Sequence, residues 1–219
     1  MQMFEGLSFI QVAVALAGGY LLGSIPFGVI TTRLGGAPDL RSIGSGNIGA
    51  TNVLRTGRKD LAAITLLGDG GKGAVAVLIA WLATQDNTLQ AQSVMTALAG
   101  GAAFLGHLFP VWLGFKGGKG VATFFGTLLA AAWPVGMLAG ATWLLMAFVF
   151  RFSSLASLTA AALAPVYVFV VGRPTPIAYL GLFMAILIYV RHTQNIRRLL
   201  RGEEPRIGQS KRAEAGAES

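Results

Sequence analysis

GVATFFGTLLAAAWPVGMLAGATWLLMAFVF, residues 120–150, sets the topology of the whole chain. The stretch has about thirty residues and no charged side chain, whereas a helix needs about twenty residues to cross a bilayer core of about 30 Å. It is therefore long for one crossing and short for two. Pro134 lies near its middle, where the missing N–H favours a break between two helices.

The rest of the chain shares this apolar character. Hydrophobic residues make up 54% of its 219 residues and charged residues 12%, although a soluble domain has about 25% charged residues. We therefore predict an all-α polytopic integral membrane protein. The first apolar stretch lacks the basic flank and small-residue exit of a cleaved signal peptide. The absence of cysteine excludes disulfides, thiolate metal sites and cysteine nucleophiles.

Basic residues indicate which helix ends face the cytoplasm, because Lys and Arg are enriched in cytoplasmic loops. Seven spans fit, at about residues 7–32, 61–83, 93–113, 120–133, 135–150, 154–171 and 176–191. The N-terminus is then outside, the C-terminus is cytoplasmic, and fifteen of the 17 Lys and Arg residues face the cytoplasm. If 120–150 were one span, the seven basic residues of the C-terminal tail would face outward. We therefore predict two short helices there.

These spans predict a single transmembrane domain over residues 1–208. The cytoplasmic tail at 209–219 is small, polar and charged, which predicts disorder. The net charge of +8 is better explained by cytoplasmic loops and anionic lipid head groups than by nucleic-acid binding. In this topology three polar stretches fall on the cytoplasmic face.

The first polar stretch is RSIGSGNIGATNVLRTG, residues 41–57. Its Gly44, Gly46 and Gly49 spell the G-x-G-x-x-G of dinucleotide-binding loops, and Asp69 follows twenty residues later. That fingerprint needs a preceding strand and a βαβ unit, whereas a membrane span and a basic loop precede these glycines. They are either ordinary turn residues or a backbone nest, in which amide N–H groups converge on an anion while Arg55 adds charge. We favour the nest; the polar side chains within it are Ser45, Asn47, Thr51 and Asn52.

The second polar stretch is GHLFPVWLGFKGGKGVATFFG, residues 106–126. It does not match the G-x-x-x-x-G-K-[ST] of ATP-hydrolysing loops, but a loop of glycines and lysines that opens a helix can still hold a phosphate. Alternatively, the lysines only mark the cytoplasmic side. His107 is either a structural residue or a phosphate ligand. The candidate loop residues are Lys116, Gly117, Gly118, Lys119 and Gly120.

The third polar stretch is RHTQNIRRLLRGEEPRIG, residues 191–208. A basic helix lying on anionic lipids would explain its arginines, but not His192 and Asn195, which share one helix face at i, i+3. Asp69 and Lys72 have the same spacing inside an apolar segment. Ionisable groups at that depth pair with each other or mark a functional site, and we favour a Lys72 that extends toward a bound phosphate.

Together these stretches resemble the PlsY family, the bacterial acyl-phosphate-dependent glycerol-3-phosphate acyltransferases. The matching motifs are GSGNIGATNVLR, the D-x-x-K-G of Asp69 to Gly73, GHLFPVWLGFKGGKGVAT and RHTQNIRRLLRGEE, in that order between Gly23 and Glu204. The resemblance implies an enzyme of the bacterial cytoplasmic membrane whose active site faces the cytoplasm. It would transfer a fatty acyl group from acyl phosphate to the 1-hydroxyl of glycerol 3-phosphate, giving lysophosphatidic acid, the first step of phospholipid synthesis. The family implies no acyl-CoA, no metal and no cofactor.

The residues suit direct transfer without an acyl-enzyme, because no Ser-His-Asp constellation is visible. We expect Ser45, Arg55, His192 and Asn195 to be catalytic, with cations and glycine amides binding the two phosphates. The proton acceptor is either His192 or the phosphate of glycerol 3-phosphate itself. Glu203 or Glu204 is expected to brace Arg198, and we expect a monomer. The H-x-x-x-x-D signature of other acyltransferases is absent.

Two other functions would also place polar motifs in a membrane protein. A transporter of phosphorylated metabolites would place its site near the membrane midplane and often shows internal repeats, but no repeat is evident here. A lipid-binding scaffold would explain the arginines but not three ordered motifs. Both remain alternatives to the acyltransferase.

Overall fold

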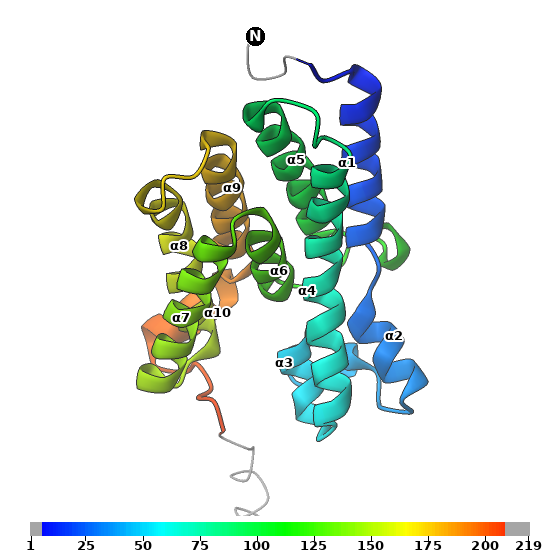
Figure 1. Cartoon of the computed structure of the whole chain (residues 1–219). Coiled ribbons are helices and arrows are strands. Elements are labelled where there is room, and N and C mark those ends of the chain that lie inside the picture. Colours follow the sequence, from blue (N-terminus) through cyan, green and yellow to red (C-terminus); the bar gives the residue numbers. More distant parts are fainter. Residues whose placement is uncertain (1–5, 209–219) are drawn as a thin grey trace, which may run out of the picture.

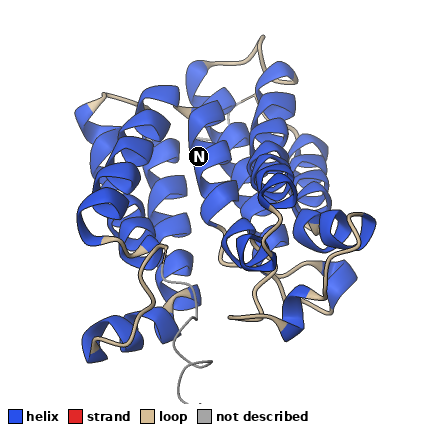
Figure 2. Cartoon of the chain, turned by 90° about the horizontal axis from the view of Figure 1, so that it is seen from below, coloured by secondary structure: helices blue, strands red, loops and turns tan. Residues whose placement is uncertain are grey.

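A computed structural model describes residues 6–208, so the predicted tail at 209–219 lies outside the described residues. This part of the chain is helical and contains no strand (Figure 2), which confirms the predicted all-α class. The helices are α1 (Phe9–Gly23), α2 (Phe27–Leu34), α3 (Ala50–Val53), α4 (Lys59–Leu82), α5 (Leu89–Leu108), α6 (Val121–Ala131), α7 (Trp133–Phe150), α8 (Ser153–Val170), α9 (Thr175–Arg191) and α10 (Thr193–Arg201). Three short 3₁₀ turns complete the described chain, η2 (Leu40–Ser42), η3 (Leu54–Thr56) and η4 (Val111–Leu113).

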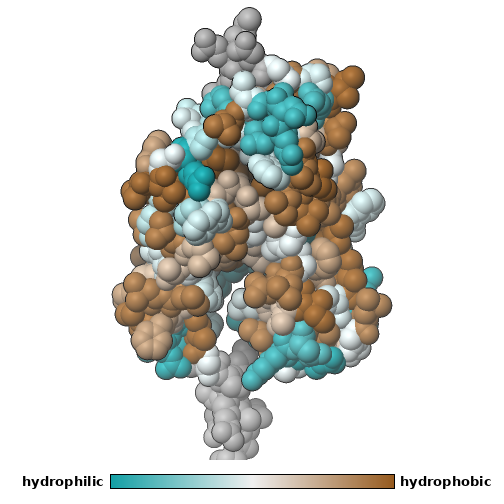
Figure 3. Space-filling model, in the orientation of Figure 1, coloured by the Kyte–Doolittle hydropathy of each residue, from teal (hydrophilic) through white to brown (hydrophobic). Residues whose placement is uncertain are grey.

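The described helices fit an integral membrane protein. Five segments are long and apolar enough to cross a bilayer, and α9 with α10, bent by 62°, raises the number to six if the pair is one span. Large apolar side chains cover the sides of the molecule (Figure 3), for example Phe9 and Phe148, which are 86% and 85% exposed. A surface of this kind fits contact with lipid. The predicted count of about seven crossings and the orientation of the termini stay predictions.

The stretch 120–150 is broken, as the sequence predicts. α6 ends at Ala131 and α7 begins at Trp133, with Pro134 in the first turn of α7, where a missing N–H costs no helical hydrogen bond. α7 then folds back along α6, so that Gly136 packs directly against the backbone of Leu129. The 11 residues of α6 are too few to cross the bilayer unaided.

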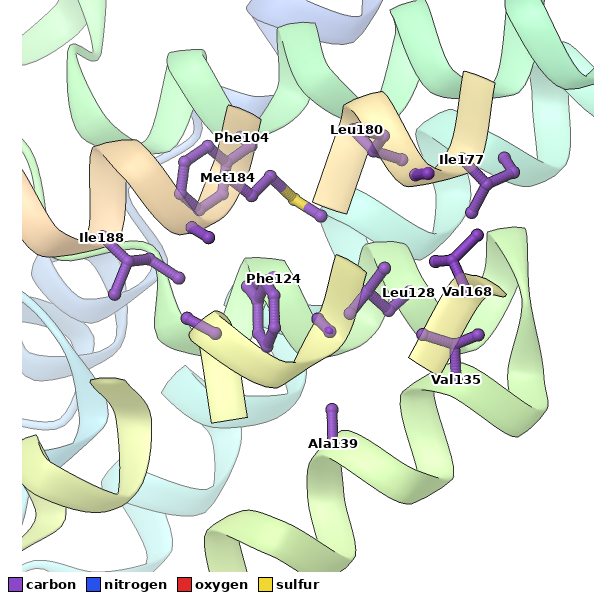
Figure 4. Packing of buried hydrophobic residues seen from close by; sticks show 14 of the residues in the cluster. Phe104, Phe124, Leu128, Val135, Ala139, Val168, Ile177, Leu180, Met184 and Ile188 are labelled. Carbon is purple, nitrogen blue, oxygen red and sulfur yellow. The ribbon is translucent and has the colours of Figure 1, made fainter. Parts of the chain in front are cut away.

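α6 nevertheless lies at the centre of the molecule. Its buried Phe124 and Leu128 join a core that includes Phe104 of α5, Val168 of α8 and Met184 of α9 (Figure 4). Against α4 it makes a closer contact, because a side chain on Gly126 would overlap the backbone of Gly70. Small residues let helices approach in this way. α6 therefore joins the two halves of the molecule, which are α1 to α5 on one side and α7 to α10 on the other.

The polar stretches gather near the N-terminal start of α6. Figure 1 shows α2, α3 and α10 at the lower end of the molecule, opposite to the start of α1. Figure 3 shows a recess between the two halves of the molecule in the same lower region. The first predicted span is interrupted here, since α1 ends at Gly23 and α2 starts at Phe27. One end of the membrane domain thus carries the loops that build the candidate site.

Candidate functional site

A cavity of about 420 Å³ lies where the three polar stretches meet. The first stretch contributes Arg41, Gly46 and Ile48, the second Phe115, Lys116 and Gly117, and the third Arg191. Three of these residues are cationic and none is acidic. Such a lining attracts an anion, and glycine backbone lets the anion approach closely.

Arg41 and Arg191 are cavity residues that the sequence analysis did not single out. Both lie inside the polar stretches, Arg41 at the start of the first and Arg191 directly before His192. Their position among several other arginines gave no sign of which guanidinium groups turn inward.

The first stretch forms a tight loop rather than a dinucleotide fold. η2 precedes its glycines, the four-residue α3 follows them, and no strand occurs among the described residues. Gly44 and Gly46 have φ angles of 53° and 66°, which glycine adopts without steric cost. The N–H of Gly46 donates to the carbonyl oxygen of Ile43 at 2.9 Å. These positive φ angles are enough to explain why both positions are glycine, as expected if the two residues are ordinary turn residues.

Asn52 holds this loop from inside. Its amide nitrogen donates to the carbonyl oxygens of Leu40 and Ile43 at 2.9 and 3.1 Å. Its amide oxygen accepts the backbone N–H of Ser45 at 3.3 Å. These contacts show that Asn52 shapes the loop, and its expected part in binding an anion stays a prediction. Ser45, Thr51 and Arg55 are exposed, whereas Asn47 has a buried amide oxygen for which the described residues supply no hydrogen-bond partner.

The glycine-lysine loop folds back onto the end of α5. The N–H groups of Gly117 and Gly118 donate to the carbonyl oxygens of Leu108 and His107, at 3.1 and 3.2 Å. These amides were expected to bind phosphate, but they are engaged by the chain itself. Gly118 packs against the imidazole of His107, and Gly120, with φ 86°, caps α6. The loop glycines thus serve close packing.

Arg191 joins the third stretch to this loop. Its Nη2 donates to the carbonyl oxygen of Gly117 at 2.8 Å and its Nε to that of Gly118 at 3.1 Å. Its guanidinium also lies 5.7 Å from the ring centre of Phe109, within the range of a cation–π contact. Because one planar guanidinium donates to two successive carbonyl oxygens, it fixes both the position and the orientation of the loop.

A second group of charged residues surrounds Lys119. Its ammonium donates to Asn195 Oδ1 at 2.6 Å, and Asn195 Nδ2 donates to Glu204 Oε1 at 2.6 Å. Glu204 also accepts from Ser154 at 2.6 Å and from Arg198 Nε at 2.7 Å, so the predicted brace of Arg198 is confirmed for Glu204. Burial lowers the pKa of Lys119 to about 8; Glu204 opposes this effect, and Arg198, Arg55 and Arg191 add to it.

His192 lies at the bend between α9 and α10 and is 3% exposed. Burial and the nearby Lys119 lower its pKa to about 4, so the imidazole is neutral near pH 7. Its Nδ1 lies 2.8 Å from the carbonyl oxygen of Ile188. Because a carbonyl can only accept, Nδ1 carries the proton and Nε2 keeps a free lone pair.

Asp69, Lys72 and His107 form a separate, buried cluster. Lys72 Nζ donates to Asp69 Oδ1 at 2.8 Å and to the carbonyl oxygen of Ile25, in the break between α1 and α2, at 2.9 Å. His107 Nδ1 lies 3.4 Å from Asp69 Oδ1. None of the three lines the cavity. Their position favours the structural alternative over phosphate binding, and it shows that the ion pair ties the broken first span to α4.

Comparisons with known proteins give a consistent result. Residues 13–202 match the family model described as glycerol-3-phosphate acyltransferase. A glycerol-3-phosphate acyltransferase of Caulobacter vibrioides is 65% identical over 214 residues, which cover 98% of this chain and 96% of the relative. The corresponding protein of Rhodospirillum rubrum is 58% identical over 201 residues, which cover 91% and 93%.

Two solved structures have the same fold. They are crystal structures of PlsY, an integral membrane glycerol 3-phosphate acyltransferase, in a glycerol 3-phosphate form and a lysophosphatidic acid form. The first has a TM-score of 0.82 and 40% sequence identity, and it covers 90% of this chain and 96% of its own. The second has a TM-score of 0.81 and 38% identity, with coverage of 90% and 95%.

Proposed function

The chain belongs to the glycerol-3-phosphate acyltransferase family, PlsY, and on that premise we propose that its acyl donor is a fatty acyl phosphate. The enzyme transfers the acyl group to the 1-hydroxyl of glycerol 3-phosphate, giving lysophosphatidic acid and inorganic phosphate. The observation that carries the proposal is the cationic cavity lined by all three polar stretches. Both substrates of this reaction carry a phosphate, and the cavity supplies Arg41, Lys116 and Arg191 to bind one.

A second cationic group supports the binding of two phosphates. Lys119 lies among Arg55, Arg191 and Arg198, all close enough to disfavour its protonation. An added dianion would relieve the mutual repulsion of these cations. Arg191 belongs to both groups, so the two phosphate positions adjoin each other.

We propose direct transfer between the two bound substrates. The oxygen of the 1-hydroxyl attacks the acyl carbonyl carbon, the carbon–oxygen bond to phosphate breaks, and phosphate leaves with the electron pair. Phosphate is a good leaving group, so positioning and charge stabilisation supply most of the catalysis. Arg55 stabilises the developing charge, Ser45 hydrogen-bonds to a substrate oxygen, and Asn195 acts by holding Lys119.

The proton of the hydroxyl goes to the better of two bases. In the protein alone, burial and Lys119 lower the pKa of His192 to about 4, whereas the second ionisation of a free phosphate ester has a pKa of about 6. We therefore propose that the phosphate of glycerol 3-phosphate accepts the proton and that His192 orients the hydroxyl through Nε2. The test is kcat of a His192→Ala variant across pH at saturating substrates. Retention of the acid limb of the profile supports the proposal, and its loss would make His192 the base.

We propose that the enzyme lies in the bacterial cytoplasmic membrane as a monomer with its site facing the cytoplasm. The exposed Arg33 lies in α2, Arg58 precedes α4, and Arg197 and Arg201 lie in α10, all in the lower part of the molecule (Figure 1). Such residues favour the cytoplasmic side.

The experiment that tests the proposed donor uses purified protein in lipid. Glycerol 3-phosphate is supplied with palmitoyl phosphate or with palmitoyl-CoA, and phosphate and lysophosphatidic acid are measured. We expect turnover with palmitoyl phosphate and none with palmitoyl-CoA. Turnover with palmitoyl-CoA but not with palmitoyl phosphate would show that the proposed donor is wrong. Arg41→Ala should lose most of this activity. Arg33→Ala is the matched control, because Arg33 is an exposed arginine that does not line the cavity.

A further inference from the structure

Phe115 has a backbone conformation that a bulky side chain rarely adopts. Its φ is 62°, and Gly114 before it has a φ of 58°. In the left-handed region a residue with a Cβ is strained, so glycine or asparagine is the usual choice. Strain of this kind concentrates at functional sites.

The turn around Phe115 maintains this conformation. The N–H of Phe115 donates to the carbonyl oxygen of Pro110 at 3.0 Å, and that of Lys116 donates to Leu113 at 3.3 Å. Both bonds involve only backbone atoms, so a glycine at 115 would form them with less strain. The benzyl side chain is therefore not needed to build the turn.

The side chain of Phe115 instead forms an apolar edge on the cationic cavity. Phe115 and Ile48 are the two apolar side chains that line it. Ile48 is 3% exposed, and Phe115 is 59% exposed, so the apolar edge runs from the buried part of the cavity to its opening. Trp112, in the same turn, is 63% exposed and does not line the cavity.

An apolar edge offers no favourable contact to glycerol 3-phosphate, which consists of polar groups on a three-carbon backbone. A long acyl chain attached to a group in the cavity must leave through the opening. Covering its first methylenes with an aromatic ring keeps them out of water as they pass the charged lining. The donor and lysophosphatidic acid both carry such a chain.

We propose that Phe115 contacts the first methylenes of the acyl chain where the chain leaves the cationic cavity, and that it thereby favours long-chain over short-chain ligands. The inference rests on the proposed function for the identity of the donor. The contact itself applies equally to the acylated product. Phe115 is therefore a specificity-determining residue.

The experiment compares Phe115→Ala and Phe115→Gly with Trp112→Ala, the matched aromatic control. In nanodiscs, we expect Phe115→Ala to raise the Kd of palmitoyl lysophosphatidic acid about tenfold, because about two methylene contacts are lost. The Kd of glycerol 3-phosphate should stay unchanged. With acyl phosphates, KM should rise about as much for the palmitoyl donor and stay unchanged for acetyl phosphate. Phe115→Gly should show the same pattern without a lower thermal midpoint.

Two results would overturn the inference. Equal weakening of glycerol 3-phosphate and lysophosphatidic acid by Phe115→Ala would mean that the residue only shapes the loop. The same chain-length effect in Trp112→Ala would mean that the turn is a general membrane anchor. Failure of the proposed donor is seen separately, as wild-type protein that binds lysophosphatidic acid but does not turn over acyl phosphates.

Discussion

Lys119 donates a hydrogen bond of 2.6 Å to the side-chain oxygen of Asn195, although 76 residues separate them. The bond joins the glycine-lysine loop to the third polar stretch. It also leaves the lysine ammonium partly buried, close to Arg55, Arg191 and Arg198. The hydrogen bond fixes the position of the ammonium charge, and the lowered pKa of Lys119 makes that charge depend on pH.

The first prediction concerns this pH sensitivity. The pKa of Lys119 is lowered to about 8, so the fraction of protonated lysine falls as the pH rises through about 8. We expect kcat/KM for glycerol 3-phosphate to fall in the same range, because this ratio reports the ionisation of the free enzyme. Lys119→Arg should flatten the alkaline limb, since a guanidinium stays charged. Lys116→Arg serves as the control. An alkaline inflexion that stays unchanged in Lys119→Arg would mean that another group causes it.

The second prediction separates a glycine that is closely packed from one that has open space beside it. A Cβ on Gly117 would overlap the carbonyl oxygens of His107 and Leu108, whereas a Cβ on Gly49 meets open space. Gly117→Ala should displace the loop and raise KM for glycerol 3-phosphate by about tenfold or more. Gly49→Ala should stay near wild type. Equal effects of the two substitutions in steady-state kinetics would contradict the packing role.

The third prediction concerns the buried ion pair of Asp69 and Lys72. Their side chains are 2% and 1% exposed, so removing one partner leaves an uncompensated buried charge. Asp69→Asn or Lys72→Met should each lower the free energy of unfolding by about 3–5 kcal/mol. The double variant should recover part of this loss. Reversible unfolding in mixed micelles measures it.

An exposed ion pair provides the control for that cycle. Arg58 and Asp60 approach to 2.6 Å, but their side chains are 47% and 58% exposed. Removing either partner should change stability little, because exposed pairs are screened by water. If the Asp69 and Lys72 variants behaved like this exposed pair, the cluster would not be structural.

The fourth prediction concerns Glu204. Burial opposes ionisation of its carboxyl group, but hydrogen bonds from Ser154, Asn195 and Arg198 outweigh burial and lower the pKa below 4.5. The stabilisation is therefore present above about pH 4.5 and is lost as the pH falls through the lower folded-state pKa. The thermal midpoint of the wild type should fall in that range. Glu204→Gln should have a lower midpoint at pH 7 and a flatter acid limb.

Glu203→Gln is the matched control, because Glu203 is the exposed neighbour of Glu204. It should keep the midpoint and the pH profile of the wild type. A Glu204→Gln variant as stable as Glu203→Gln at pH 7 would contradict the bracing role.

The class of fold and the convergence of the motifs could be predicted from sequence. Apolar stretches and Pro134 indicate helices and the break between α6 and α7, because helix length and proline act locally. The distribution of basic residues predicts that three distant stretches meet on one face. The cavity contains residues of all three.

The inward or outward direction of individual side chains could not be predicted. Lys72 was expected to reach a phosphate, but its ammonium is taken by Asp69 and by a carbonyl freed where α1 ends. Arg191 gave no signal because its partners are backbone oxygens of Gly117 and Gly118, more than seventy residues away in sequence. Such contacts depend on tertiary geometry that no local pattern encodes.

The position of Arg191 near the C-terminal end of the membrane domain has a consequence for biosynthesis. A ribosome makes the chain from its N-terminus, so the first two polar stretches are synthesised before Arg191, His192 and Asn195 exist. Until then the glycine-lysine loop lacks its guanidinium support and the cavity lacks one wall. A nascent chain that ends before residue 191 cannot form the complete cavity, and we expect acyl transfer only after α9 has been made.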